Sequence, residues 1–105
     1  TGFWQFKIQI QTNTKAVFSP TVEMDLIYPN PAGHKIIIPI SNQKRMDTTL
    51  KLINIAGQTI KIIHQGALPK GNSQFETMVN DLPSGTYFVV LETKIGVKTR
   101  KIIVE

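Results

Sequence analysis

Turn-forming residues recur about every eight to twelve residues from Met24 to the last residue, and this spacing restricts the fold more than any other feature. Between the turns lie short runs in which apolar and polar residues alternate, and no stretch keeps a helical period. The pattern predicts an all-β sandwich. The strands that we expect span residues 24–28, 34–41, 48–55, 59–64, 73–79, 86–93 and 97–105.

The last two of these strands are the most clearly defined. Pro83 and Gly85 mark the turn before them, because Pro presets one φ angle and Gly accepts a positive one. The residues 94–96 that join the two strands suit a hairpin in which Gly96 takes the left-handed position of a bulge. The chain is therefore expected to end inside a strand. On the first of the two strands, one face carries Tyr87, Val89 and Leu91.

Three further segments have a predicted structure: a strand interrupted by proline, a loop and an N-terminal strand. Pro39 lies inside the strand 34–41, and a residue without an N–H predicts an edge position or a bulge there. Residues 65–72 contain Gly and Pro and are expected to form a loop. Residues 2–11 alternate, which predicts a half-buried strand whose apolar face carries Trp4, Phe6, Ile8 and Ile10.

A boundary is expected near residue 22. We interpret residues 1–22 as the end of a preceding domain or a linker with one extra strand, and residues 23–105 as the main domain. The chain does not start with Met, which suggests a piece of a longer precursor. No apolar run is long enough to span a bilayer.

The charge is positive, with twelve Lys and Arg against seven Asp and Glu, and it is densest in the final strand. A basic chain suggests nucleic acid, an anionic membrane surface or an acidic polysaccharide as partner. A solvated strand face explains the same charges and is the favoured interpretation. The chain has no Cys, which excludes disulfides, Cys-ligated zinc and thiol nucleophiles.

The residue inventory does not favour an enzyme. His34 and His64 each lie at the end of a strand, where exposed side chains are expected, and no Gly-x-Ser-x-Gly elbow is present. A zinc site would have these two His residues and no evident third or fourth ligand. The sequence places no two carboxylates together for acid–base catalysis, because the candidates lie at scattered turn or strand positions: Asp25, Asp47 and Asp81. We expect no cofactor, no metal and no catalysis.

Three motifs stand in order along the chain. They are Tyr-Pro-Asn-Pro-Ala at 28–32, Asn-Ile-Ala-Gly-Gln at 54–58 and Leu-Pro-Ser-Gly-Thr-Tyr-Phe-Val at 82–89, before a basic final strand. Together, over roughly residues 24–105, they resemble the C-terminal sorting domain of cargo proteins of the type IX secretion system. The sequence departs from the family pattern at Asn54, often Asp, and at Ile95, often a polar residue. The family's motif positions fall on Pro29, Asn30, Pro31, Gly57, Gly85, Tyr87 and Lys101.

The resemblance implies an immunoglobulin-like seven-stranded antiparallel β-sandwich that acts as an address for secretion. Translocon and shuttle proteins of the outer membrane would recognise it after export to the periplasm. A surface sortase would then remove the domain, with the cut between residues 11 and 23, and many cargos of the family become linked to an anionic lipopolysaccharide. The passenger would end at the cell surface or outside the cell, and the domain would neither bind nucleic acid nor span a membrane.

The terminal strand is the candidate partner-binding site. An edge strand presents unpaired N–H and C=O groups that a receptor can extend with a strand of its own. Basic side chains there would add charge complementarity, or would only keep the edge soluble and prevent self-pairing. The candidate residues are Lys98, Arg100, Lys101, Ile102, Ile103, Val104 and Glu105.

The motif residues have structural interpretations as well. Stiffening of the first turn by residues 29–31 is favoured over receptor contact. Gly57 and Gly85 are expected at positive φ. Tyr87 is expected in the core with its hydroxyl satisfied at the rim.

A carbohydrate-binding or adhesive sandwich is the alternative function. It would need an exposed aromatic platform built from Trp4, Tyr28 and Tyr87, whereas their positions on apolar faces predict burial. A single-stranded nucleic-acid binder would need aromatic residues among the basic ones, and the final strand has none. An exposed edge together with an alternating N-terminal strand makes a strand-exchanged homodimer a further hypothesis.

Overall fold

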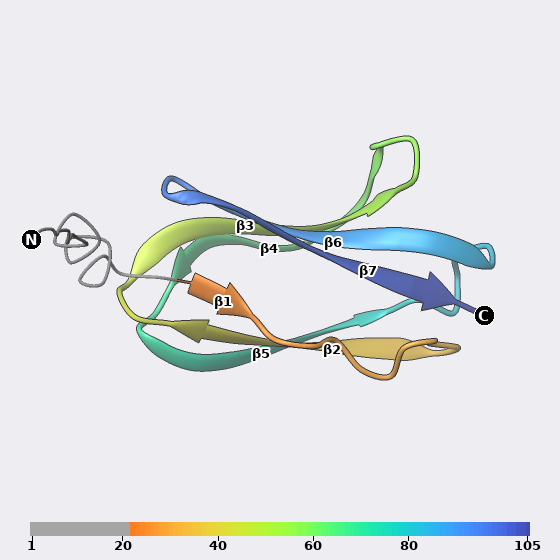
Figure 1. Cartoon of the computed structure of the whole chain (residues 1–105), viewed down its shortest axis with the longest axis horizontal. Coiled ribbons are helices and arrows are strands. Elements are labelled where there is room, and N and C mark those ends of the chain that lie inside the picture. The colour runs from red at the N-terminus through yellow and green to blue at the C-terminus, as the bar shows by residue number, and fades with distance from the viewer. Residues whose placement is uncertain (1–21) are drawn as a thin grey trace, which may run out of the picture.

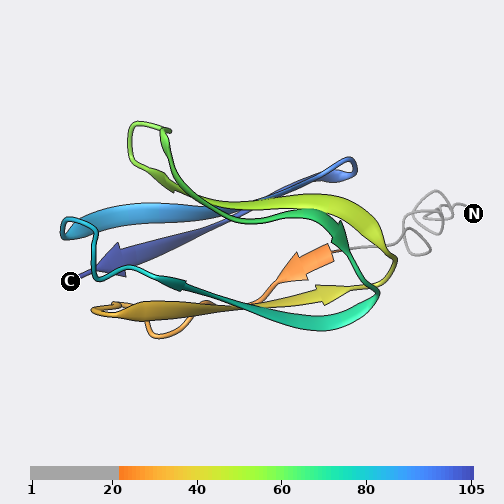
Figure 2. The ribbon, with the colours of Figure 1, turned by 180° about the vertical axis from the view of Figure 1, so that it is seen from behind.

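Alternating apolar side chains build two antiparallel sheets that face each other across one core. The computed structural model describes residues 22–105 (Figure 1). One sheet has the strand order β1-β2-β5 and the other the order β4-β3-β6-β7, and the view from behind shows the same two layers (Figure 2). The strands are β1 (Val22–Met24), β2 (Lys35–Asn42), β3 (Met46–Asn54), β4 (Thr59–Leu68), β5 (Gly71–Met78), β6 (Gly85–Thr93) and β7 (Gly96–Val104).

This arrangement is the seven-stranded immunoglobulin-like sandwich that the sequence predicted. The chain crosses between the sheets after β2, after β4 and after β5, so neighbours in sequence are not always neighbours in a sheet. In constant-type immunoglobulin domains the fourth strand extends the sheet of the first two. Here β4 pairs with β3 instead, which gives the second sheet four strands.

The core lies between the two sheets and is made of the inward-facing residues of alternating strands. Leu50 and Leu52 of β3 are fully buried because β4 and β6 flank that strand on both sides. Burying a side chain of this size contributes roughly 1.5–3 kcal/mol to the free energy of unfolding. The other fully buried large side chains are Ile36, Ile38, Ile40, Leu68, Val79, Val89, Leu91, Ile102 and Val104.

Tyr87 anchors the start of β6. Its side chain is only 7% exposed. Its hydroxyl donates to the carbonyl oxygen of Pro83, four residues upstream, at 2.7 Å. The prediction of a core Tyr with a satisfied hydroxyl is therefore confirmed, and the geometry matches the tyrosine corner of immunoglobulin-like domains.

The prediction that Pro39 marks an edge or a bulge is wrong. β2 is the middle strand of its sheet, and Pro39 pairs in register with Gln74 of β5. The backbone groups of Ile37 point toward the chain after β1, where they exchange hydrogen bonds with Tyr28, and Pro39 points the same way because it lies two residues on. β1 has already ended at Met24, so the absent N–H of Pro39 falls where no strand needs it.

The loop predicted at residues 65–72 is much shorter in the structure. β4 continues to Leu68 and β5 starts at Gly71, which leaves two connecting residues. Asn42, buried at the end of β2, donates through Nδ2 to the carbonyl oxygens of Leu68 at 3.1 Å and Pro69 at 3.0 Å. This side chain takes up carbonyls that a tight connection would otherwise leave unpaired.

Two other expectations concern the hairpin and the N-terminal region. Gly96 pairs directly with Thr93, so the β6–β7 link has two residues rather than three. The strand predicted at residues 2–11 lies outside the residues that the structure describes, and the boundary near residue 22 stays a prediction.

Replacing Tyr87 with Phe tests the corner. The change removes one hydroxyl and leaves the ring, so the free energy of unfolding should fall by about 1 kcal/mol, the net value of one hydrogen bond. Urea denaturation of the 105-residue chain measures the effect. Tyr28→Phe is the control, since that side chain is 47% exposed and its loss should stay within about 0.5 kcal/mol. Equal effects of the two substitutions would show that the corner contributes nothing special.

Candidate partner-binding edge

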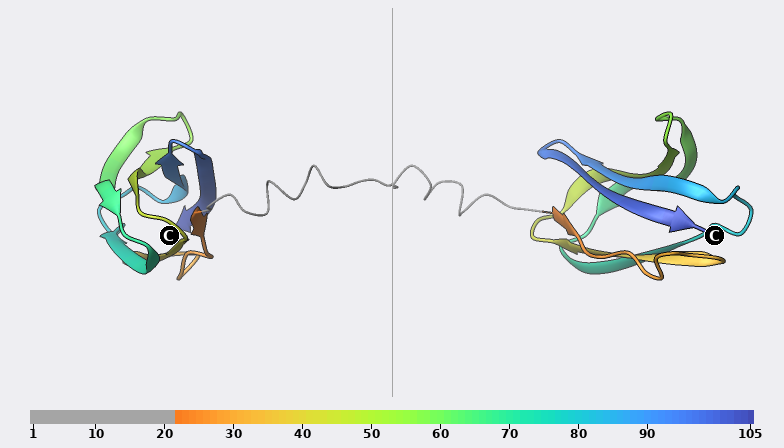
Figure 3. Two further views of the ribbon diagram at one scale, coloured as in Figure 1. Left: turned by 90° about the vertical axis from the view of Figure 1, so that its left-hand side faces the viewer. Right: turned by 45° about the vertical axis from the view of Figure 1, so that its right-hand side comes forward.

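The terminal strand β7 lies at one edge of the four-stranded sheet. It pairs with β6 in an unbroken antiparallel register from Gly96 opposite Thr93 to Val104 opposite Gly85. Seen along the sandwich, β7 lies on the same side as β1, with β4 and β5 on the opposite side (Figure 3). The outer edge of β7 therefore faces the beginning of the described chain.

Alternation along β7 determines which backbone groups face outward. In an antiparallel pair, every second residue directs its N–H and C=O away from the partner strand. Ile103 is such a residue, because its N–H and C=O bond to the turn before β2 and not to β6. With no irregularity in the register, Val97, Thr99 and Lys101 also direct their backbone groups outward.

Asn30 of the Pro-Asn-Pro motif binds this edge with its side chain. Its Oδ1 accepts the N–H of Ile103 at 2.9 Å, and its Nδ2 donates to the carbonyl oxygen of Lys101 at 3.3 Å. The carboxamide has one acceptor and one donor at about the spacing of a peptide group. It thus stands in for a residue of a neighbouring strand.

Ala32 continues the pairing with its backbone. Its N–H donates to the carbonyl oxygen of Ile103 at 2.8 Å, and its carbonyl accepts the N–H of Glu105 at 2.9 Å. Ala32 and Val104 form an isolated parallel bridge. We call the hydrogen bonds made by Asn30 and Ala32 to β7 and Glu105 the clasp, and they close the C-terminal half of the edge.

In the part of the chain that the structure describes, the outward backbone groups of the other half of the edge stay unpaired, although side chains there reach β1. Within residues 22–105, no backbone group pairs with the outward N–H and C=O of Val97 and Thr99. Val97 itself is 60% exposed, and Thr99 is exposed as well. The accessible edge thus runs from the hairpin to Lys101, where the clasp begins.

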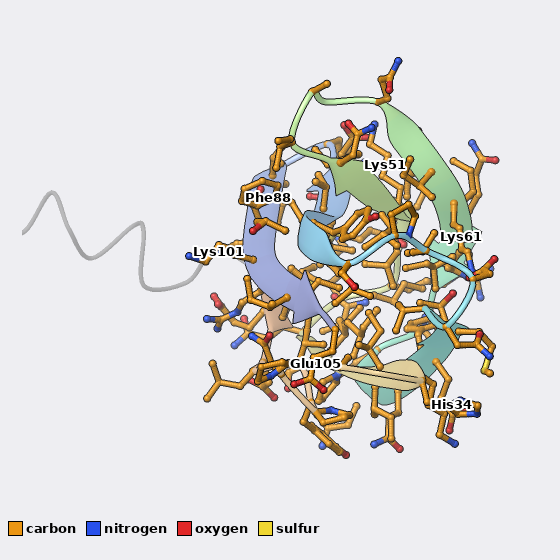
Figure 4. All side chains as sticks on the ribbon, turned by 90° about the vertical axis from the view of Figure 1, so that its right-hand side faces the viewer. His34, Lys51, Lys61, Phe88, Lys101 and Glu105 are labelled. Carbon is orange, nitrogen blue, oxygen red and sulfur yellow. The ribbon has the colours of Figure 1, made fainter. Side chains whose placement is uncertain are left out.

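The basic side chains of β7 were all expected to be available to a partner, but they do not all face outward. Lys98 Nζ lies 3.5 Å from a carboxylate oxygen of Glu23. Arg100 donates through Nε and Nη2 to the carbonyl oxygen of Met24 at 3.0 and 2.9 Å. Both therefore hold β1 against β7. Lys101 projects away from the sandwich beside Phe88 (Figure 4).

The last four predicted site residues divide in the same way. Ile102 and Val104 are buried in the core, so their side chains are not available to a partner of the folded domain. Ile103 is half-buried on the outer face, with its backbone held by the clasp. Glu105 is exposed at the C-terminal end (Figure 4).

The turn residues serve the local backbone. Gly57 has a φ of +84° and Gly85 a φ of +151°, both of which L-residues with side chains rarely adopt. Asn54 organises the β3–β4 turn, because its Oδ1 accepts the N–H groups of Ala56 at 2.9 Å and Gln58 at 3.0 Å. An Asp would accept the same two bonds. The Asn also donates to Gln58 Oε1 at 2.9 Å.

On the opposite side of the sandwich, Lys61 of β4 links the two sheets. Its Nζ donates to the carbonyl oxygen of Met78 at 2.6 Å and to Asp81 Oδ1 at 3.0 Å. The hydrogen bond from Lys61 holds the pKa of the Asp81 carboxyl below its ordinary value, since it favours the charged form. This ion pair lies at the surface, and Figure 4 labels Lys61 on the side of the sandwich opposite Lys101.

Two expectations about ring side chains are wrong. His64 is not exposed like His34, because it pairs with the core residue Leu50 and packs on Phe75 with ring centroids 4.9 Å apart. A bulge in β4 opposite β3 accounts for this orientation. Tyr28 is about half exposed rather than buried, and Gln74 Nε2 donates to its hydroxyl at 2.9 Å.

The described part of the chain shows no group of three or more potential metal-binding side chains. No helix in residues 22–105 has the length and hydropathy needed to cross a membrane. The fold and the site define an immunoglobulin-like domain whose terminal strand forms a partly open sheet edge.

Comparison with known families places the domain. The model of the secretion system C-terminal sorting domain matches residues 26–105, most of the chain. The chain belongs to this family, the type IX secretion sorting domains, as its three motifs predicted. The family consists of sorting signals and is not a family of enzymes.

Comparison with solved structures finds the first immunoglobulin domain of mouse SynCAM 2. The similarity has a TM-score of 0.39 and 20% sequence identity and covers 81% of this chain and 91% of that domain. The immunoglobulin-like fold follows from the strand order of the two sheets. A search of curated proteins finds no significant match.

Sequence reasoning missed the clasp. The motif predicts a stiff turn at residues 29–31, whereas the side chain of Asn30 also reaches residues more than seventy positions away. The one available signal was that Asn, flanked by two residues without N–H groups, has a side chain able to supply both a donor and an acceptor.

Substitution of Asn30 tests the clasp. Asn30→Ala removes two hydrogen bonds and should lower the free energy of unfolding by about 1–2 kcal/mol. Asn30→Asp keeps the acceptor for Ile103 but sets an anionic oxygen against the carbonyl of Lys101, so it should also destabilise. Asn72→Ala, on the exposed strand β5, is the control and should change stability by less than about 0.5 kcal/mol. If both Asn30 variants unfold at the control's urea midpoint, the clasp has no energetic role.

The Asp81 pair predicts a pH dependence. A carboxyl whose folded pKa is lowered stabilises the fold above its ordinary pKa of about 3.9, and this contribution is lost as the pH falls through the folded value. The difference in unfolding free energy between the wild type and Asp81→Asn should therefore be largest near neutral pH and shrink below about pH 4. Urea titrations at several pH values measure it. A difference that does not vary with pH would show that the charge of Asp81 is not involved.

Proposed function

We propose that this domain carries a passenger protein across the outer membrane through the type IX secretion system. The observation that carries the proposal is the family match over residues 26–105. The proposed partners are the translocon and shuttle proteins of that system. The passenger would cross the periplasm and end at the cell surface or outside the cell.

Removal of the domain by a surface sortase belongs to the same proposal. The cut would fall between residues 11 and 23, an interval that ends within β1. A cut before Val22 would leave β1 with the domain, where Lys98 and Arg100 link β1 to β7. The released domain would therefore keep all seven strands and the clasp.

We also propose that the domain performs no chemistry and acts only as a label. The alternative of a carbohydrate-binding or adhesive module has less support. Its aromatic platform would have needed Tyr87, which is buried, and Tyr28, whose hydroxyl already accepts a hydrogen bond from Gln74.

Export of a reporter tests the function. Residues 12–105 are fused behind an inert periplasmic reporter in a host that has the secretion system, and surface reporter is measured by protease accessibility on intact cells. We expect the reporter at the surface or in the medium, and in the periplasm of an isogenic strain that lacks the translocon. A folded fusion that stays periplasmic in both strains would contradict the proposed function.

Processing is read from the same cells. The sortase proposal expects the surface reporter to lose the mass of the domain, with a new C-terminus between residues 11 and 23 by mass spectrometry. A reporter that reaches the surface with the domain intact would contradict cleavage while leaving the sorting role in place.

A further inference from the structure

We propose that the secretion partner recognises this domain by adding one extended strand to the open half of β7, between Val97 and Lys101. The inference rests on the proposed function, because it names how the sorting partner binds. It also limits that contact to a short segment and excludes the C-terminal end of β7, where the clasp occupies the same backbone groups.

The available hydrogen-bonding groups determine the register. Val97 and Thr99 each direct an N–H and a C=O outward, and Lys101 adds an outward N–H. The carbonyl of Lys101 already accepts the Asn30 amide, so the partner strand ends there. A strand of about five residues can pair with these groups, and addition of a strand to a sheet edge is a common mode of peptide recognition.

The other edges are less suitable. β1 has only three residues. β4 contains two irregularities in its register with β3, and bulges of this kind disfavour pairing with a further strand. On β5, Lys61 reaches across to the carbonyl of Met78 and covers one end of that edge. β7 has nine residues in an unbroken register.

The side chains on the open half indicate the chemistry of the partner. Val97, Thr99 and Lys101 alternate onto one face of the strand, in the order apolar, hydroxyl, cation. Ile95, in the adjacent hairpin turn, is 55% exposed and extends the apolar end. Side chains directly opposite each other in a sheet interact, so the partner strand should present an apolar residue near Val97 and a carboxylate near Lys101.

Thr99→Pro separates this edge from the rest of the fold. The outward N–H of Thr99 takes no part in the β6 ladder, and Pro is tolerated on an edge strand where its nitrogen faces solvent. The substitution removes one donor and places a ring where a partner strand would approach. In the reporter assay, export should fall about tenfold or more. One lost hydrogen bond and a steric conflict together should weaken binding of the partner strand by more than about 1.4 kcal/mol, which corresponds to a tenfold loss of affinity. Thr99→Ala, which keeps the N–H but removes the hydroxyl, should lose clearly less export than Thr99→Pro, because the backbone hydrogen bond to the partner strand remains.

Folding of the variants is checked by circular dichroism and urea denaturation. If Thr99→Pro is folded and exported like the wild type, strand addition at this edge is overturned and the sorting function stands. If Thr99→Pro does not fold, Lys101→Glu decides, because this exposed residue lies outside the core and its reversed charge should repel the expected carboxylate. Export of a folded Lys101→Glu variant at the wild-type level would then overturn the proposal.

Two further outcomes are distinguishable. A wild-type fusion that is not exported removes the proposed function, and the inference falls with it. Light scattering of the purified 105-residue chain tests whether a second copy occupies the edge. A dimer that Thr99→Pro dissociates would assign the open edge to self-association and overturn the assignment to a secretion partner, whereas a monomer at high concentration agrees with it.

Discussion

The pairing of the turn before β2 with the last strand is the interaction on which the rest of the structure depends. Hydrophobic burial stabilises the packing of the two sheets, but it does not satisfy the outer backbone groups of the terminal strand. Asn30 and Ala32, in the connection between β1 and β2, satisfy that edge at Lys101, Ile103 and Glu105. The first and last parts of the domain are thereby held together, with Ile102 and Val104 buried beneath them.

The contacts of β7 with the start of the domain leave few of its basic side chains facing outward. Arg100 and Lys98 continue the contact between β7 and β1, so two of the basic residues at the end of the chain act within the domain. Lys101 remains as an outward cation at the boundary between the closed and the open part of the edge. A terminal strand that is half closed is held within the fold at one end and leaves backbone groups for the proposed partner strand at the other.

The fold could be predicted from the sequence because alternation and turn residues act locally, and Tyr87 could be placed in the core for the same reason. The position of Pro39 in a middle strand could not be predicted, because it depends on where the neighbouring strand β1 ends. The sequence of residues 34–41 does not contain that information. The extent of β4 depends on the buried Asn42, and the orientation of His64 depends on a bulge. Asn30 is the extreme case, because its role requires knowing that β7 lies beside it. Contacts of this range leave no periodic signal in a single sequence.

Residue-resolved amide hydrogen exchange of the folded domain tests the central claim, that the outer edge of the terminal strand is closed at one end and open at the other. The N–H groups of Ile103 and Glu105 should be protected by the clasp, while those of Val97, Thr99 and Lys101 should exchange at rates close to those of an unstructured chain. Equal protection of all five, or rapid exchange at Ile103 and Glu105, would contradict the account.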